Sequence, residues 1–190
     1  MTTSAITICN AAFLALGGKT ISDFDENSDG AILAKNLYPS VRDWMLRKHP
    51  WNCAVKRVIL SPDATPPAFG FSYQFTQPSD LLRILQVGDE LDGPLEYRNE
   101  SKKILGDFDA LKLRYVFRNE VESTWDAAFI HAMGLAMKAI FAYPITQSTS
   151  KEQLCLADLS NVLKEARSID GLEDPPETFG DFLILNARNR

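Results

Sequence analysis

The sequence predicts an α+β fold with a four-helix bundle-like core, an inserted small antiparallel β-sheet and an extended C-terminal arm. Apolar residues recur at helical spacing in the first and last parts of the domain, and they alternate as in a strand between the two. We therefore assign residues 1–170 to one domain, helical at 1–60 and 123–170, with the β insertion at 68–119. Residues 171–190 are assigned to the arm.

Two helices are predicted in the N-terminal helical part. Residues 6–16 are rich in alanine and leucine, and Gly17-Gly18 ends this helix because glycine tolerates the left-handed cap conformation. Asn27 or Ser28 caps the second helix, whose apolar residues continue at helical spacing to residue 45. Pro39 lies inside that pattern and is expected to kink or break the helix.

The middle of the chain is predicted to form strands. Four aromatic residues alternate with small or polar ones: Phe69, Phe71, Tyr73 and Phe75. Residues 81–87 are more continuously apolar, as in a central strand, and 95–99 with 102–105 have the pattern of a hairpin. Residues 111–117 alternate as a half-buried antiparallel strand does.

Two further helices are predicted before the arm, at 125–143 and 151–169, closed by Pro144 and by Asp170-Gly171 respectively. Pro175-Pro176 then favours an extended exit from the domain. The apolar cluster beyond it is expected to dock on another chain, through Phe179, Phe182, Leu183, Ile184, Leu185 and Arg188. The alternative is that this segment folds back onto its own helices.

Charge and composition narrow the function classes. The formal net charge of −5 argues against tight general binding to phosphate backbones, which needs clustered Lys and Arg. No apolar run approaches the roughly 20 residues that span a bilayer, and we expect no signal peptide. A reducing cytoplasm is therefore expected. Cys9, Cys53 and Cys155 are most simply buried thiols, with a zinc or redox site as the alternative.

Residues 25–32 resemble the first part of a calcium-binding loop, with oxygen ligands at Asp25, Asn27 and Asp29 and a glycine in sixth place. The twelfth position holds Asn36 instead of the bidentate Glu that closes such a site, so an acidic helix-capping loop is the preferred interpretation. The two histidines, His49 and His131, lie in different predicted helices. With no phosphate loop and no nucleophile elbow in the sequence, we expect neither enzymatic activity nor a cofactor.

Several stretches together carry a resemblance to a known family: Ile8-Cys9-Asn10-Ala11-Ala12 with residues 14–21, Asp25-Glu26-Asn27-Ser28, Leu37-Tyr38-Pro39 through Arg42-Asp43 to His49-Pro50-Trp51, Gln77-Pro78-Ser79-Asp80-Leu81-Leu82-Arg83, and Ala142-Tyr143-Pro144-Ile145-Thr146. In these stretches the chain resembles the tail tubular protein A-like family of bacteriophage head-to-tail connectors. These stretches occur in the family's order and cover roughly residues 5–170. Asn27 stands where the family usually has a second acid.

This resemblance implies a structural subunit of the virion, assembled in the host cytoplasm. It implies a dodecameric ring docked under the portal protein, which retains packaged DNA and anchors the tail nozzle protein and the tail fibres or spikes. Double-stranded DNA would pass through the channel without sequence-specific binding, and no membrane is involved. The portal, or otherwise a neighbouring subunit, would receive the arm. The alternative is a small calcium-binding or nucleic-acid-binding module.

Two further expectations concern the ring. Large aromatic anchors in the contacts between subunits are expected at Tyr38, Trp44 and Trp51, with the alternative that they belong to the core. An acidic or neutral channel wall is expected because repelled phosphates slide without sticking. The candidates for that wall are Asp23, Asp25, Glu26 and Asp29.

Overall fold

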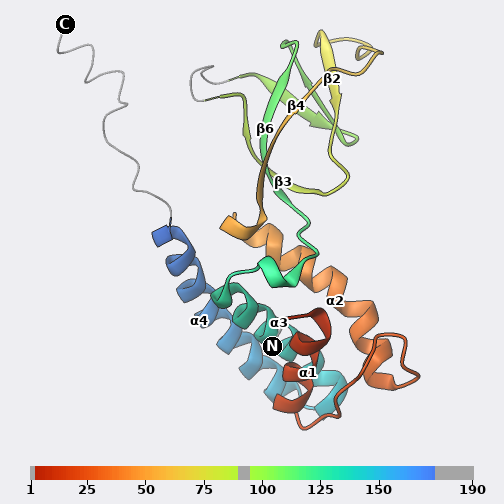
Figure 1. Cartoon of the computed structure of the whole chain (residues 1–190), viewed down its shortest axis with the longest axis vertical. Helices are drawn as coiled ribbons and strands as arrows, with labels where there is room; N and C mark the ends of the chain where they lie inside the picture. The colour runs from red at the N-terminus through yellow and green to blue at the C-terminus, as the bar shows by residue number, and fades with distance from the viewer. Residues whose placement is uncertain (1–2, 90–94, 174–190) are drawn as a thin grey trace, which may run out of the picture.

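A computed structural model describes residues 3–89 and 95–173, and within these ranges the fold is α+β, as predicted. Four α-helices form one layer, and two three-stranded antiparallel sheets stand on it at one side (Figure 1). The chain leaves the helical layer after the second helix, builds both sheets and returns to the helical layer for the last two helices.

Helix α1 spans Ala5–Ala15 and has defined caps at both ends. Ser4 and Thr7 form a capping box at its start. At its end Gly17 has φ +79°, and the N–H of Gly18 donates to the carbonyl of Phe13 at 2.8 Å. This arrangement is a Schellman cap, which satisfies the last carbonyls and needs glycine at the left-handed position. The predicted stop at these glycines is therefore confirmed.

Helix α2 spans Asp29–Lys48, with Ser28 as its N-cap. Pro39 was predicted to kink or break this helix, and the break is wrong because the helix continues through this residue. Proline removes one backbone donor on the exposed side, whereas Tyr38 and Val41, on either side of it, are buried against the other helices. Burial of that continuous apolar face outweighs the single hydrogen bond that is lost.

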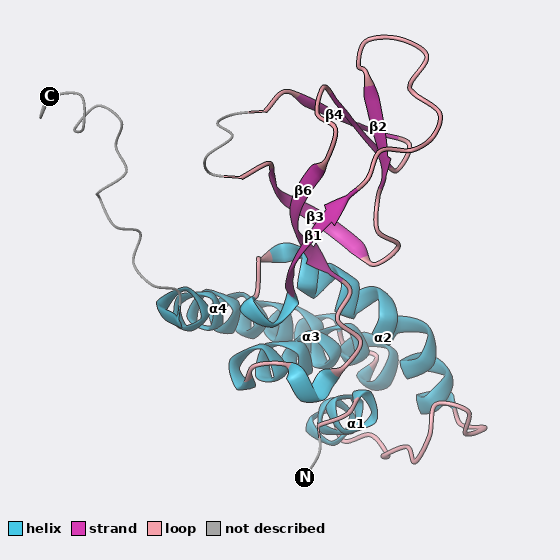
Figure 2. Ribbon diagram, turned by 45° about the horizontal axis from the view of Figure 1, so that its top comes forward, coloured by secondary structure: helices cyan, strands magenta, loops and turns pink. Residues whose placement is uncertain are grey.

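The sheets are two, not the single sheet predicted (Figure 2). The first has the order β1-β6-β3, made of Val55–Leu60, Leu111–Phe117 and Leu81–Val87. The second has the order β2-β5-β4, made of Tyr73–Thr76, Lys103–Gly106 and Tyr97–Glu100. Strand β1 lies in the part predicted to be helical, and β3, predicted to be central, is at an edge because β6 pairs with both neighbours.

The hairpin predicted between residues 95 and 105 is confirmed as β4 and β5. Ser101 and Lys102 have φ of 48° and 60°, which is the geometry of a tight two-residue hairpin turn. The strand predicted for the aromatic stretch is shorter than expected, since only Tyr73 and Phe75 lie in β2 and Phe69 is 88% exposed.

A small core lies between the two sheets and is separate from the helical core. Its buried members are Phe75, Ile104, Leu111, Leu113 and Tyr115. Phe108 stacks on Phe75 with 5.3 Å between ring centroids. Gly106 allows this approach, because a Cβ at that position would overlap the Phe108 ring. The sheets therefore form a unit with its own apolar interior.

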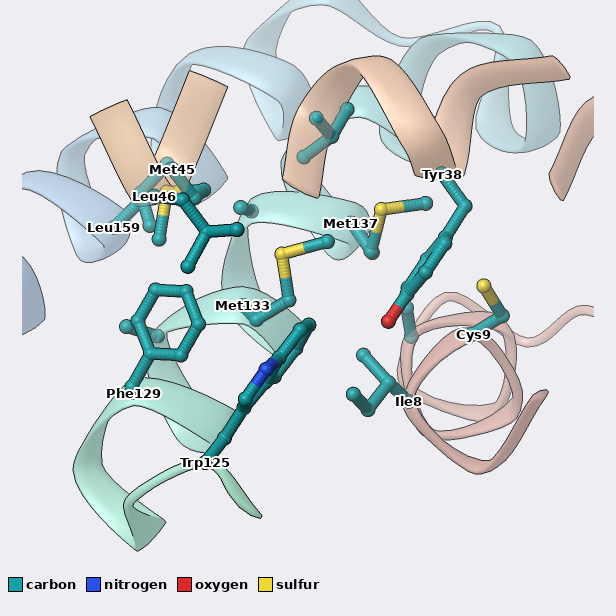
Figure 3. Packing of buried hydrophobic residues seen from close by; sticks show 14 of the residues in the cluster. Ile8, Cys9, Tyr38, Met45, Leu46, Trp125, Phe129, Met133, Met137 and Leu159 are labelled. Atoms are coloured by element: carbon teal, nitrogen blue, oxygen red, sulfur yellow. The ribbon is translucent and has the colours of Figure 1, made fainter. Parts of the chain in front are cut away.

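Helix α3 (Ala127–Thr146) is the centre of the helical layer and packs against α1, α2 and α4 (Thr149–Glu173). This arrangement does not by itself confirm a four-helix bundle. Figure 3 shows the core that α3 shares with α1 and α2, including Phe129, Met133 and Tyr38. Two predicted helix ends are wrong: α3 continues past Pro144 to Thr146, and α4 continues past Asp170-Gly171. Short 3-10 turns, η1 (Asn52–Ala54) and η3 (Glu122–Thr124), connect the layers.

Helix α3 is long and apolar enough to cross a membrane by length and composition, contrary to the expectation that no such run exists. Its buried residues, among them Phe129, Met137 and Phe141, contact other helices of the layer. A core helix passes the same test, so this feature is weak evidence for a membrane span.

Gly134 sits inside α3, and an added Cβ there would meet no atom within 4 Å. Replacing Gly134 by alanine is expected to raise the free energy of unfolding by about 0.5–1 kcal/mol, because alanine loses less backbone entropy in a helix. Urea denaturation of the two proteins measures this difference. A less stable variant would show that the space beside Gly134 is needed by the fold.

Candidate docking surfaces and the joint between layers

A network of ion pairs joins the helical layer to the sheets. The guanidinium of Arg42, which is only 8% exposed, lies 3.0 Å from Asp43 and 2.9 Å from Glu120. Asp43 also accepts a hydrogen bond from Nε of Arg118 at 2.7 Å. One carboxylate on α2 thus binds an arginine of its own helix and another that follows β6, which fixes the sheets relative to the helices.

Asp80 is a second junction, within the first sheet. Its carboxylate accepts from Lys56 at 2.9 Å and from the Tyr115 hydroxyl at 3.0 Å, so it links β1 and β6 to the start of β3. Burial raises the pKa of Asp80, but the bonds from Lys56 and Tyr115 outweigh it and hold the pKa below its usual value. Burial and the bond to Asp80 raise the pKa of Tyr115 to about 12.

Replacing Asp80 by asparagine is expected to lower the free energy of unfolding by about 1–3 kcal/mol at neutral pH. Because the folded state lowers the pKa of Asp80, its contribution is present above the usual carboxyl range and is lost as the pH falls through the folded pKa. The difference between wild type and Asp80→Asn should therefore shrink at about pH 2–3, measured by urea denaturation. A difference that is equal at both pH values would contradict this role.

A third junction ties α4 to the end of α2. Asp170 is buried, and its carboxylate lies 3.0 Å from Nε2 of His49 and 3.1 Å from the backbone nitrogen of Asn52. Its backbone carbonyl accepts from the Asn52 side chain at 3.0 Å. His49 therefore takes part in a contact that holds the fold together. His131 lies separately on the exposed side of α3.

Two of the three aromatic residues expected to anchor contacts between subunits belong to the core instead. Tyr38 is buried, and its hydroxyl donates to Glu122 at 2.9 Å. Trp51 is 1% exposed, and its indole N–H donates to the carbonyl of Met45 at 3.0 Å. That expectation is corrected for both, because each ring fills space between helices. Trp44 alone of the three is on the surface, at 46% exposed.

The four candidate wall acids lie close together in the chain at one end of α2, far from the sheets (Figure 1). Asp23, Asp25 and Glu26 are on the loop between α1 and α2, and Asp29 is the first residue of α2. Asp25 pairs with Lys35 at 2.5 Å, and this bond holds the pKa of Asp25 below its usual value.

Two acids of the segment that resembles a calcium-binding loop already have partners within the chain. Asp25 is engaged by Lys35, and the backbone nitrogen and hydroxyl of Ser22 both donate to Glu26 at 2.9 Å. Over residues 3–89 and 95–173, no group of three or more His, Cys, Asp or Glu side chains is placed to hold a metal ion. The cysteines are free in this region, with Cys9 and Cys155 buried and Cys53 half-buried. Burial raises the pKa of the Cys9 thiol to about 12.

The surface between α2 and α4 contains a groove of about 330 Å³ that the sequence did not suggest. Residues of both helices line it: Trp44, Lys48, Leu156, Leu159, Ser160, Leu163, Lys164 and Arg167. The Lys48 ammonium lies 3.8 Å from the centroid of the Trp44 ring. The groove therefore combines an apolar floor with three basic side chains, and we call it the α2–α4 groove.

Two other hollows differ in chemistry. One lies between α1 and α3 and is lined mainly by small residues, including Ala11, Ala15 and Gly134. The other lies on the first sheet, with Arg57, Lys112 and Arg114 among its lining residues. The aromatic stretch of residues 69–75 is divided between interior and surface, since Phe75 is core while Phe69 is exposed.

The candidate docking residues of the arm, Phe179, Phe182, Leu183, Ile184, Leu185 and Arg188, lie outside the described residues. Comparisons of the sequence with protein-family models and with curated proteins find no match.

Proposed function

We propose that this chain is a non-enzymatic structural subunit of a bacteriophage head-to-tail connector. It forms a ring below the portal that extends the DNA channel, retains packaged DNA and anchors the tail nozzle and the fibres or spikes. The observation that carries this proposal is that the stretches which resemble the connector family supply the residues that hold the fold together at its junctions.

The first of these stretches fixes the loop after α1. The side-chain amide of Asn10 donates to the carbonyl of Ile21 at 2.9 Å, and its oxygen accepts from the nitrogen of Ile21 at 2.8 Å. These two hydrogen bonds attach the loop at Ile21 to the helix residue eleven positions earlier in the chain. The asparagine amide makes both bonds because it carries a donor and an acceptor on one planar group.

The later stretches supply the joint between layers. Asp43 binds Arg42 and Arg118, and Asp80 binds Lys56 and Tyr115. His49 contacts Asp170. A chain that shares these stretches with a family also shares the residues whose contacts position its sheets relative to its helices. This supports a common architecture, in which the helical layer serves as a bundle-like core.

A ring of identical subunits is consistent with the surface. Heterologous contacts need two different complementary faces on each subunit, and the α2–α4 groove offers one concave face. In the proposed ring the acidic loop, with Asp23, Asp25, Glu26 and Asp29, contributes to an acidic or neutral channel wall. A ring with Lys and Arg lining its narrowest section would contradict that orientation.

The proposal is tested by the composition of the particle. We expect purified virions that encode this chain to contain it in proportion to the portal protein, one copy for each portal subunit, by quantitative mass spectrometry. Its absence from particles, or its presence only in infected cells before assembly, would refute a structural role in the virion.

A nucleic-acid-binding module is the second candidate, favoured by one observation. Arg57 and Arg114 are cross-strand neighbours on the first sheet, and the buried Nε of Arg114 has no hydrogen-bond partner among the described residues. A gel shift at physiological salt distinguishes the two proposals: affinity for DNA in the range of specific binders favours the module, whereas a channel subunit should show none. For a calcium-binding module, a calcium-dependent rise in the melting temperature would be the corresponding sign.

A further inference from the structure

We propose that residues 174–190 of one copy of this chain bind in the α2–α4 groove of a second copy. This inference deepens the proposed function, because it gives the ring its repeating contact between subunits. The groove supplies the concave face, and the segment that follows α4 supplies the other. Four features support the pairing: an apolar floor, basic side chains around it, the complementary sequence of the segment, and the two prolines that follow α4 in the sequence.

The floor of the groove leaves apolar surface in contact with water. Trp44 and Leu156 are each 46% exposed, and they flank Leu159 and Leu163, which are almost fully buried. Among the described residues, no further apolar layer covers these two exposed side chains. An apolar segment laid along the groove would cover both and remove this surface from water.

The groove is also positively charged. Lys48 comes from α2, and Lys164 and Arg167 come from α4. The buried Nε of Arg167 has no hydrogen-bond partner among residues 3–89 and 95–173. A buried guanidinium nitrogen without an acceptor is unfavourable, so a partner that brings a carboxylate or a carbonyl to this site would satisfy it.

The segment after α4 has the complementary chemistry. Phe179 and Phe182 through Leu185 supply apolar side chains, and Glu177 and Asp181 place acids beside them. Acids next to aromatics in the segment thus match lysines and an arginine next to an exposed tryptophan in the groove. The α1–α3 hollow, lined by small residues with Lys138 and His131 as its basic or titratable members, offers no such match for two acids and two phenylalanine rings.

The direction of the chain favours a second copy over the same copy. Leu156 lies about 26 Å from Glu173 along α4, at roughly 1.5 Å for each residue of the helix. To reach its own groove, the segment would have to turn back directly after α4. Pro175-Pro176 opposes such a turn, because each proline restricts the preceding residue to extended conformations. A neighbouring copy can receive the segment without this reversal.

The test is a cross-linking experiment on the full chain. The photoreactive substitution Phe182→p-benzoyl-phenylalanine is introduced, and isotopically labelled and unlabelled chains are mixed in equal amounts across the micromolar to millimolar range. We expect the cross-links, located by mass spectrometry, to fall on peptides of α2 and α4 that line the groove and to join labelled to unlabelled chains. Links within single chains only, links to another surface, or no links would each overturn the proposal.

Charge variants test the chemistry of the contact. Lys164→Glu should lower the yield of groove cross-links at least about fivefold, and adding Asp181→Lys to the same chain should restore most of it. Lys151→Glu is the matched control, since Lys151 is exposed on α4 outside the groove. Equal losses for Lys164→Glu and Lys151→Glu would contradict a specific contact.

The outcomes for this contact and for the connector proposal are separable. A ring found in virions without cross-links in the groove would leave the connector role standing and overturn the groove contact. If the cross-links fall in the groove but the chain is absent from virions, the groove contact would stand and the connector role would be overturned.

Discussion

Replacing Trp51 by alanine is expected to lower the free energy of unfolding by about 3–5 kcal/mol. The ring is 1% exposed, lies 4.7 Å from the centroid of Phe129 and 4.7 Å from that of His49, and its N–H donates to the carbonyl of Met45. Removing it leaves a cavity between the end of α2 and α3 and an unpaired carbonyl. Equilibrium denaturation in urea measures the loss.

Trp44→Ala is the control for this variant, because Trp44 is of the same residue type on the same part of the chain but is exposed. We expect it to change the free energy of unfolding by less than about 1 kcal/mol, while it weakens any association through the α2–α4 groove. If Trp51→Ala were as stable as Trp44→Ala, the assignment of Trp51 to the core would be wrong.

Replacing Asp43 by alanine is expected to lower the free energy of unfolding by about 2–4 kcal/mol. The substitution leaves Arg42, which is buried, with Glu120 as its remaining partner, and it takes the Asp43 carboxylate from Arg118. The loss comes from the guanidinium of Arg42, which stays buried with one carboxylate instead of two, and from that of Arg118, which no longer has the Asp43 carboxylate. Thermal or urea denaturation measures it.

Asp158→Ala provides the comparison, since Asp158 lies 4.0 Å from Lys138 in a pair that is partly exposed on both sides. Its removal should cost no more than about 0.5 kcal/mol. A double-mutant cycle between Asp43 and Arg118 should give a coupling well above that value. Additive effects of the two substitutions would mean that the contact between them does not stabilise the joint.

The sequence predicted the elements whose pattern is local. The Schellman cap at Gly17 and Gly18 and the hairpin between β4 and β5 follow from residue types at fixed positions, and both are confirmed. The wrong predictions have a common cause: they depend on packing between distant segments, which rules based on neighbouring residues do not include. Pro39 does not break α2, because the buried face on both sides of it continues.

Strand β1 was missed because its sequence, Val-Lys-Arg-Val-Ile-Leu, is short and is separated from a long helix by only six residues. Its pairing with β6, from Val55 opposite Val116 to Leu60 opposite Leu111, comes from a partner more than fifty residues away. The edge position of β3 has the same origin. Strand order depends on contacts between distant segments, which alternation within one segment does not encode.

The candidate surfaces were predicted only in part. Tyr38, Trp44 and Trp51 are all large aromatic residues in the sequence, yet of the three only Trp44 is exposed. Leu156 belongs with Cys155 and Leu159 to an apolar pattern of helical spacing, which predicts one buried face, yet it is 46% exposed and that prediction is wrong for it. The groove itself depends on the distance between α2 and α4, and no residue pattern specifies that distance.

Electron cryomicroscopy of tails purified from particles that contain this chain tests the connector role most directly. We predict a ring of twelve copies immediately below the portal, with the DNA channel passing through it and the helical layers of adjacent copies in contact. A map in which this density is absent from the region below the portal, or in which the chain occupies another part of the particle, would contradict the account.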